Sequence, residues 1–154
     1  MDLQDSLLPG CLIRPATARD MGSIWKMVLG AKLDPTQLRP QQFWTIVCNG
    51  ELVACGQLRH FDNAQELGSL VVRREWRGRG LGTILTQHLI QQATQPLYLE
   101  CLGDRLARFY TRLGFEIVPW QELPRSLKLK FGISHIARKL FGVPVEILKY
   151  RGKS

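Results

Sequence analysis

Apolar and polar positions alternate in short segments along this chain, and the segments predict both strands and helices. The Asn49-Gly50 pair separates two apolar runs and is a strong signal for a two-residue hairpin. The early strands are therefore expected to form antiparallel hairpins. The segments with the length and composition of strands are residues 12–15, 43–48, 52–60, 66–72, 97–102, 115–118 and 145–150.

Helical spacing of apolar residues occurs between these strands. Residues 18–31, behind a capping-box pattern, and residues 83–93 each place apolar side chains on one side of a helix. Asp104 is expected to cap a third helix, which Gly114 ends. Residues 127–130 are expected to be extended, and a basic amphipathic helix to follow them. The order β-α-β-β-β-α-β-α-β, with a tail helix and strand, predicts a mixed α/β fold.

Length and composition indicate one globular domain. The chain has 154 residues, of which 45% are hydrophobic, enough to bury a core without disulfides or a metal. Its apolar runs are all shorter than the roughly 18 residues that a membrane span needs. The N-terminus begins acidic and lacks the basic region of a signal peptide. The chain is therefore expected to be cytoplasmic.

The cysteines and histidines do not suggest a metal site. The four cysteines form no CxxC pair, and the three histidines are scattered. Cys48, Cys55 and Cys101 lie in apolar runs, where a free cysteine is usually a small core residue. Reduced thiols at these positions fit the cytosol.

The segment RGRGLGT, residues 77–83, follows an apolar strand and leads directly into a helix. Glycines lack a Cβ, so backbone N–H groups can close on an anion, and the helix N-terminus adds donors and a positive dipole end. Taken alone, the turn is either a phosphate site or an ordinary strand–helix connection. A P-loop is excluded because no Gly-Lys-Ser/Thr follows, and the antiparallel strands before the turn disfavour a dinucleotide-binding loop.

Two further motifs change this picture. The segment LVVRREWRGRGLG is followed by FYTRLGFE, and IRPAT precedes both. With these motifs in this order, the chain resembles the GNAT superfamily of acyl-CoA N-acyltransferases over roughly residues 12–118, and part of the pattern is similar to cyanobacterial and plastid members. The resemblance implies a mixed sheet with splayed central strands, flanked by helices. It also implies a single domain over residues 1–154, of which residues 119–154 are a C-terminal extension.

The resemblance implies acetyl-CoA as co-substrate, without a metal. The pantetheine arm is expected to pair with the backbone of residues 70–72, as an added strand would. The pyrophosphate is expected to lie on the N–H groups of residues 77–83. The expected cofactor-binding residues are Leu70, Val71, Val72, Arg77, Gly78, Arg79, Gly80, Leu81, Gly82 and Thr83.

The chemistry that the resemblance implies is direct attack of a neutral amine on the acetyl thioester. A base must first remove a proton from the ammonium. Glu66 stands where several family members keep this base, and the alternative is an exposed carboxylate at a strand edge. Glu100 and His60 are weaker substitutes for Glu66.

Two further groups complete the expected reaction. A backbone N–H, that of Val71 or Val72, is expected to stabilise the tetrahedral oxyanion. Tyr110 sits where the family places the tyrosine that protonates the departing CoA thiolate. The alternative for Tyr110 is an aromatic packing role on its helix.

The positive charge of the chain lies mainly at its C-terminal end. The net charge is +8, and residues 125–154 hold eight basic residues against one acidic residue. If residues 145–150 are the last family strand, residues 120–143 are an insertion with a basic helix. This helix covers the acceptor site, forms a homodimer contact, lies on an anionic surface, or packs its apolar side on the sheet and leaves its charges in water. The last alternative carries the most weight.

The sequence therefore predicts an N-acetyltransferase that moves an acetyl group from acetyl-CoA to a primary amine. The acceptor is a small amine or amino acid, a protein lysine, or a protein N-terminus, and the sequence does not choose among them. One alternative is a non-catalytic CoA-binding sensor module. Another is binding of nucleic acid or an anionic surface through the basic residues 125–153, although nucleic-acid and membrane partners are not expected.

Overall fold

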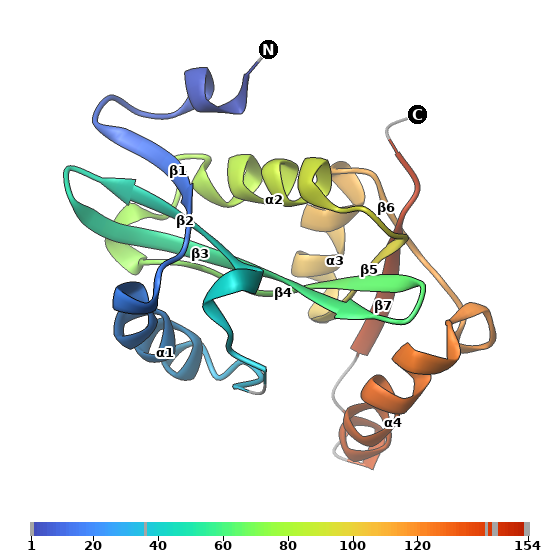
Figure 1. Cartoon of the computed structure of the whole chain (residues 1–154). Coiled ribbons are helices and arrows are strands. Elements are labelled where there is room, and N and C mark those ends of the chain that lie inside the picture. The colour runs from blue at the N-terminus through green and yellow to red at the C-terminus, as the bar shows by residue number, and fades with distance from the viewer. Residues whose placement is uncertain (1, 36, 141, 143–144, 153–154) are drawn as a thin grey trace. The chain divides into compact units, whose positions relative to one another are not determined.

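The structure of the chain, a computed structural model, describes residues 2–35, 37–140, 142 and 145–152 (Figure 1). Strands and helices follow one another in the order predicted from the sequence. The helices are α1 (Met21–Gly30), α2 (Leu81–Gln92), α3 (Gly103–Arg112) and α4 (Arg125–Leu140). The strands are β1 (Cys11–Pro15), β2 (Phe43–Cys48), β3 (Glu51–Phe61), β4 (Ala64–Val72), β5 (Leu97–Leu102), β6 (Phe115–Ile117) and β7 (Val145–Tyr150).

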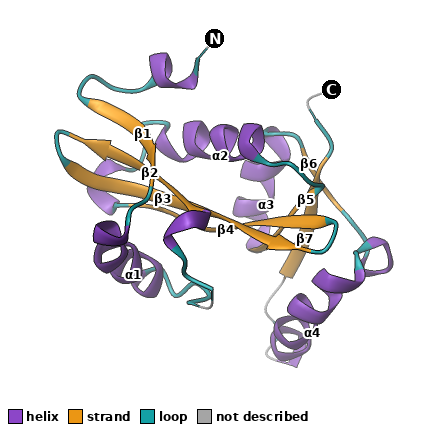
Figure 2. Ribbon diagram, viewed as in Figure 1, coloured by secondary structure: helices purple, strands orange, loops and turns teal. Residues whose placement is uncertain are grey.

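The strands form one seven-stranded mixed sheet in the order β1-β2-β3-β4-β5-β7-β6 (Figure 2). The β1/β2 and β2/β3 pairs are antiparallel, whereas β4 and β5 are parallel. The last strand, β7, lies between β5 and β6 and is antiparallel to both. The expected mixed α/β fold with antiparallel N-terminal strands is therefore confirmed.

The chain forms two compact units, and each is described separately. The first comprises Met1–Arg59 and Leu67–Gln92, and the second comprises His60–Glu66 and Ala93–Ser154. Strand β4 contributes to both units, because Glu66 belongs to the second and Leu67 to the first. The predicted single domain, with its core over residues 12–118, stays a prediction.

In the first unit, α1 packs on the β2–β3 hairpin. Ile24 and Val28 on α1 are fully buried, and they share an apolar cluster with Phe43 and Cys55 of the strands. Their spacing of four residues puts both on one side of the helix. Burial of side chains of this size contributes about 1.5–3 kcal/mol each, so this cluster stabilises the hairpin.

Helix α2 also belongs to the first unit and approaches the strands closely at Gly56. A Cβ at Gly56 would lie 2.6 Å from the Leu89 side chain and 3.3 Å from that of Leu70. The Trp44 ring on β2 lies edge-on to the His88 ring on α2, with the centroids 4.3 Å apart. The missing side chain at Gly56 thus lets α2 seat its apolar side directly on β3.

The cysteines of β1 and β2 differ from the prediction. Cys11 and Cys48 are directly opposite in the antiparallel register and are joined by a disulfide. The expectation of a reduced Cys48 is therefore wrong, because strand register brings a distant thiol against it. Cys55 and Cys101 are free and buried, as expected. The cytoplasmic location, which rested partly on reduced thiols, stays a prediction.

In the second unit, α3 and α4 pack on opposite faces of β5 and β7. Leu127 and Phe131 of α4 share a buried cluster with Tyr98 and Ile147. Helix α3 contacts the other face, where the rings of Tyr110, Phe115 and Tyr150 pack edge to face in succession. Neighbouring residues of a strand point to opposite faces, which is how β7 serves both helices.

Two predicted helix boundaries are wrong. Helix α4 already includes residues 127–130, which were expected to be extended, and the N–H groups of Leu127 and Lys128 both donate to the Pro124 carbonyl. This turn is favoured because the four-residue spacing of Leu127 and Phe131 buries both. Helix α3 begins at Gly103, so Asp104 lies in its first turn and is not its cap. None of the described helices is long and apolar enough to cross a membrane.

Candidate active site

The glycine-rich turn lies in the first unit, between the end of β4 and the start of α2. Gly78 and Gly80 have φ angles of +76° and +79°, a region that favours glycine. Apart from the glycine itself and its two chain neighbours, no described heavy atom lies within 4 Å of the Cβ that alanine would carry at either position. The first intrahelical N–H groups of α2, whose carbonyl partners the helix cannot supply, follow directly. The turn is therefore open backbone at a helix N-terminus, as an anion site requires.

Two arginines of this turn are exposed and held by neighbours. The Arg77 Nε donates to the Val72 carbonyl at 3.0 Å. The Arg79 guanidinium lies over the Trp76 ring, 4.7 Å from its centroid. This stacking on an aromatic ring favours one position for the Arg79 cation.

An irregularity in β4 immediately precedes residues 70–72. Ser69 has a φ angle of +52° and is 6% exposed, which is unusual for a non-glycine residue inside a strand. Its hydroxyl donates to Gln57 Oε1 at 2.9 Å, and its carbonyl accepts the Cys55 thiol at 3.5 Å. These bonds hold a left-handed residue in a strand, so the strand turns just before the segment expected to bind pantetheine.

A buried arginine lies against this irregularity. Arg59 on β3 is 2% exposed, and its guanidinium donates to the Asp34 carbonyl at 3.3 Å and to Ser69 Oγ at 3.4 Å. Gly68 makes room for it, since a Cβ there would lie 2.5 Å from Nη1. Sequence reasoning missed both Arg59 and Ser69. A glycine inside a strand pattern, Gly68, is the signal that indicates a bulge or close approach there.

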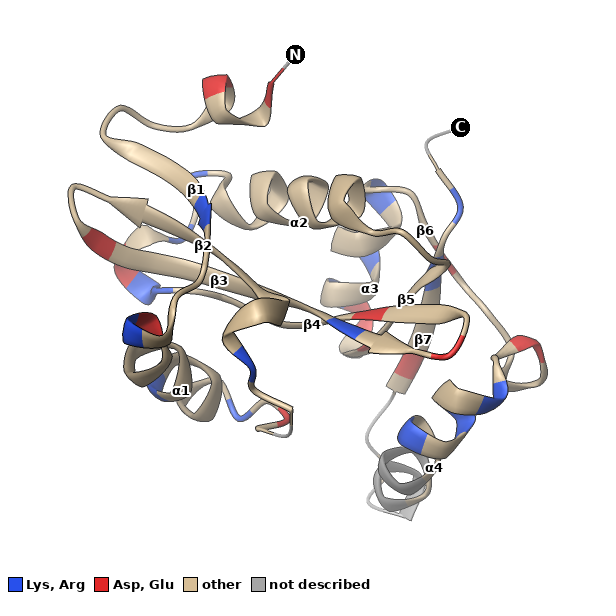
Figure 3. Cartoon of the chain, viewed as in Figure 1, with Lys and Arg blue, Asp and Glu red and all other residues tan. Residues whose placement is uncertain are grey.

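Glu66 lies in the second unit, opposite Tyr98 of β5. It is 4% exposed, and its carboxylate accepts a hydrogen bond from the Lys130 ammonium of α4. The alternative of an exposed carboxylate at a strand edge is therefore wrong. Figure 3 colours the positions of Lys and Arg residues blue on the ribbon of the described part of α4. The role of Glu66 as a base stays a prediction.

Tyr110 projects from α3 in the second unit and is 7% exposed. Its ring packs edge to face against Phe109 and Phe115, with centroid distances of 5.0 and 5.7 Å. Burial raises the pKa of the phenol above its usual value, and the nearby Cys101 thiol adds to this. The phenol is therefore protonated at neutral pH, but the same raised pKa makes it a weaker proton donor than an exposed tyrosine. These contacts fit both a packing role and an acid role, so the acid role stays a prediction.

His60 and Glu100, the weaker candidates for the base, lie in different surroundings from Glu66. His60 Nδ1 lies 3.2 Å from the side-chain amide nitrogen of Gln65. The side-chain oxygen of Gln65 accepts hydrogen bonds from the backbone N–H groups of Thr94 and Gln95. This network ties the β3–β4 turn to the end of the α2–β5 connection within the second unit. Glu100 lies opposite Ile147 in the β5/β7 register.

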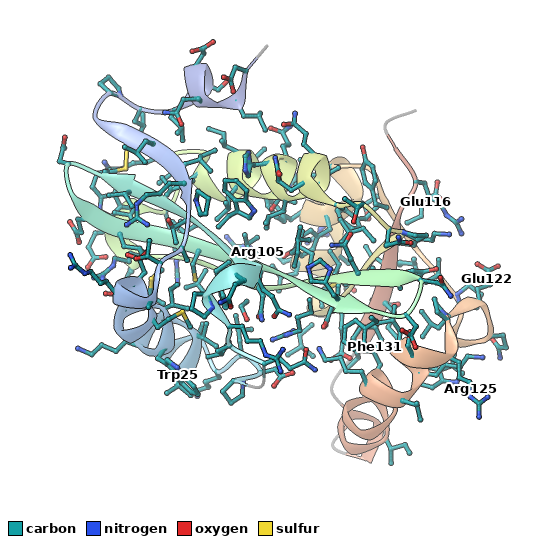
Figure 4. All side chains as sticks on the ribbon, in the orientation of Figure 1. Trp25, Arg105, Glu116, Glu122, Arg125 and Phe131 are labelled. Atoms are coloured by element: carbon teal, nitrogen blue, oxygen red, sulfur yellow. A yellow bond between two sulfur atoms is a disulfide. The ribbon has the colours of Figure 1, made fainter. Side chains whose placement is uncertain are left out.

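Side chains that could hold a metal ion do not cluster in the part of the chain that the structure describes. No group of three or more His, Cys, Asp or Glu residues occurs there. Figure 4, which displays the side chains, labels Phe131 on the side of α4 that packs into the cluster of the second unit.

Comparison with known proteins identifies the family to which this fold and glycine turn belong. The sequence profile of the Acetyltransferase (GNAT) family matches residues 15–115, so the chain belongs to this family. An amino-acid acetyltransferase of Shewanella oneidensis is 27% identical over 129 residues, which cover 75% of this chain and 29% of the relative. The similarity to cyanobacterial and plastid members stays a prediction.

Solved structures share the fold. N-acetylglutamate synthase from Neisseria gonorrhoeae, complexed with coenzyme A and N-acetyl-glutamate, superposes with a TM-score of 0.69 at 19% identity, over 96% of this chain and 36% of that one. Rv2747 from Mycobacterium tuberculosis, in complex with CoA, superposes with a TM-score of 0.73 at 18% identity, over 90% and 98% of the two chains. The chain thus spans about a third of the length of the Shewanella and Neisseria proteins.

Proposed function

We propose that this chain is an acetyl-CoA-dependent N-acetyltransferase that acts on a primary amine. The observation that carries the proposal is the turn of residues 77–83, an open glycine cradle at the N-terminus of α2 in a member of the GNAT family. The CoA complexes of N-acetylglutamate synthase and Rv2747 support the same donor.

The residues of the first unit fit acetyl-CoA. Backbone N–H groups of residues 77–83 hold the pyrophosphate, and the exposed Arg77 and Arg79 supply positive charge beside it. The backbone of residues 70–72 pairs with the pantetheine arm. The full set of proposed cofactor-binding residues remains Leu70, Val71, Val72, Arg77, Gly78, Arg79, Gly80, Leu81, Gly82 and Thr83.

The chemistry needs three further groups. Glu66, directly or through water, takes a proton from the acceptor ammonium, and the neutral nitrogen then attacks the thioester carbonyl carbon. The N–H of Val71 or Val72 donates to the oxyanion that forms. As the C–S bond breaks, the electron pair leaves on sulfur, and the nitrogen releases its second proton to water to give the amide. The Tyr110 phenol supplies the proton that converts the thiolate to CoA thiol, and the phenolate takes a proton back from water.

The proposal is tested by measuring two quantities on the same protein. Calorimetry gives the affinity for acetyl-CoA and CoA, and thiol release gives turnover with a panel of amino acids, simple amines and peptides. Binding together with turnover of any amine supports the proposal. Binding without turnover on the whole panel favours a non-catalytic sensor, and failure to bind either ligand contradicts the cofactor site.

A further inference from the structure

Ser69 has a backbone conformation that residues other than glycine rarely adopt, and it has it inside β4. Its φ of +52° lies in the left-handed region, whereas the φ of the adjacent Gly68, which has no Cβ to strain, is not positive. Ser69 is also buried. A left-handed residue inside a strand persists only where its surroundings hold it. The neighbours of Ser69, and not the local preference of the chain, therefore set this conformation.

Two side chains of β3 hold the Ser69 hydroxyl in one orientation. Arg59 is a cation and only donates, so the Ser69 oxygen accepts its hydrogen bond at 3.4 Å. The hydroxyl hydrogen is then donated to Gln57 Oε1 at 2.9 Å. The Gln57 amide nitrogen points the other way, because it donates to the Gln37 carbonyl at 2.6 Å and to Gln42 Oε1 at 2.9 Å. Each donor in this buried network therefore has its acceptor in place, and the network fixes Ser69.

The backbone N–H groups at the end of β4 point alternately toward β3 and away from it. Neighbouring residues of a strand direct their backbone groups to opposite sides. The Arg73 N–H donates to the Val53 carbonyl of β3 at 2.8 Å. The Val71 N–H, two residues earlier, therefore also faces β3. The N–H groups of Leu70 and Val72 face away from β3, on the side of β4 where the pantetheine arm is proposed to pair.

We propose that Ser69 is a positioning residue, whose left-handed conformation aims the N–H groups of Leu70 and Val72 at the carbonyl oxygen of bound acetyl-CoA. Because a peptide unit is planar, the backbone angles of Ser69 set the direction of the N–H that follows it. Donors stabilise an oxyanion best when they are aimed before the reaction begins. The inference rests on the proposed acetyltransferase activity. It assigns the oxyanion donor to the N–H groups that face away from β3, so the Val71 N–H is not the donor.

Two substitutions of Ser69 separate the backbone conformation from the hydroxyl. Ser69→Gly and Ser69→Ala both remove the hydrogen bonds with Gln57 and Arg59, so both variants are expected to unfold at a lower denaturant concentration. Glycine adopts a left-handed φ without strain, whereas the Cβ of alanine is strained there. Activity is therefore expected to follow the conformation, and stability to follow the hydroxyl.

Steady-state kinetics and calorimetry on the full chain measure this difference, with an amine from the panel that the unmodified protein acetylates. Ser69→Ala is expected to lower kcat about tenfold to a hundredfold, up to the cost of losing one oxyanion donor. Its affinity for CoA, which has no acetyl group, should stay within about twofold, because the turn of residues 77–83 is unchanged. Ser69→Gly should keep kcat within about threefold of the unmodified protein. Ser23→Ala on α1 is the matched control and should leave kcat unchanged.

Infrared spectroscopy of bound acetyl-CoA tests the direction of the donors without any acceptor amine. A hydrogen bond to a carbonyl oxygen lowers the stretching frequency of that carbonyl, and an isotopic label on the carbonyl carbon identifies its band. The frequency in Ser69→Gly is expected to match that in the unmodified protein, and the frequency in Ser69→Ala is expected to rise. A loss of stability by itself would not move this band.

A Ser69→Ala variant that keeps both the kcat and the carbonyl frequency of the unmodified protein would overturn the inference. So would a Ser69→Gly variant that loses as much kcat as Ser69→Ala, because the role would then belong to the hydroxyl. If Ser69→Ala does not fold, Ser69→Gly decides: a raised carbonyl frequency contradicts the inference, and an unchanged one supports it. The acetyltransferase proposal fails on a different result, when the unmodified protein does not bind acetyl-CoA or acetylates no amine.

Discussion

Glu66 and Tyr110 lie on opposite faces of the strands in the second unit. Glu66 faces α4 and pairs with Lys130, whereas Tyr110 packs from α3 against Phe115. The proposed base and the proposed acid therefore do not exchange a proton with each other by direct contact. The proposed reaction gives each of them a separate proton transfer, one at the acceptor nitrogen and one at the departing sulfur.

Tyr110→Phe is expected to lower kcat about tenfold to a hundredfold while the affinity for acetyl-CoA stays within about twofold, since general acid catalysis has roughly this size. The ring contacts with Phe109 and Phe115 need no hydroxyl, so stability should change little. Turnover and calorimetry on the same preparation measure the two effects. An unaltered kcat would leave Tyr110 with a packing role alone.

The raised pKa of Tyr110 gives a prediction for the pH dependence of turnover. Burial favours the neutral phenol, so Tyr110 is fully protonated at neutral pH. It loses its proton only above the ordinary tyrosine pKa of about 10. Turnover should therefore show no decline assignable to this group between about pH 7 and pH 9.5. A decline in that range that disappears in Tyr110→Phe would contradict the buried, protonated phenol.

Gly80→Glu should weaken acetyl-CoA binding about tenfold or more, because it adds bulk and a negative charge to the proposed phosphate cradle. Its φ of +79° also strains any side chain, which should cost about 1–2 kcal/mol of stability. Gly22→Glu in α1 is the control, with the same change of residue and nothing within 4 Å of the added Cβ. Equal CoA affinity in both variants would remove the turn from the binding site.

The disulfide between Cys11 and Cys48 should stabilise the first unit. It closes a sequence separation of 37 residues, for which the chain-entropy account gives up to about 4 kcal/mol. Unfolding by denaturant should show that dithiothreitol lowers the free energy of unfolding of the unmodified protein. It should not change that of the Cys11→Ser/Cys48→Ser variant. Identical unfolding of the unmodified protein in both conditions would mean that the bond does not form in solution.

The Arg14–Asp20 pair should make stability fall in acid. The hydrogen bond from Arg14 lowers the pKa of Asp20 from 3.8 to about 2, with a further contribution from the Thr17 N–H. Because the folded-state pKa is the lower one, the stabilisation is present above about pH 4 and is lost as pH falls towards 2. Asp20→Asn should cost on the order of 1–2 kcal/mol at pH 7 and much less at pH 2, as measured by urea unfolding. A cost that does not change with pH would contradict the ion pair.

The sequence by itself determined the order of elements, the glycine turn and the family. These features depend on local spacing, since side chains three or four residues apart share a helix face and glycines permit a tight turn wherever the chain folds. The turn at Gly78 and Gly80 could therefore be predicted from its amino-acid sequence alone. The helix boundary at Pro124 could not, because burial of Leu127 and Phe131 against β5 and β7 decides it.

Tertiary structure decided which distant residues meet. Glu66 and Lys130 are 64 positions apart, and Cys11 and Cys48 are 37 apart. Such pairs depend on strand register and helix rotation, which are set by the packing of many residues together. The left-handed conformation of Ser69 is of the same kind, since it is held by Gln57 and Cys55 of the neighbouring strand. The proposed donor site, the turn of residues 77–83, was thus determined by local sequence, and the surroundings of Glu66 were determined by long-range packing.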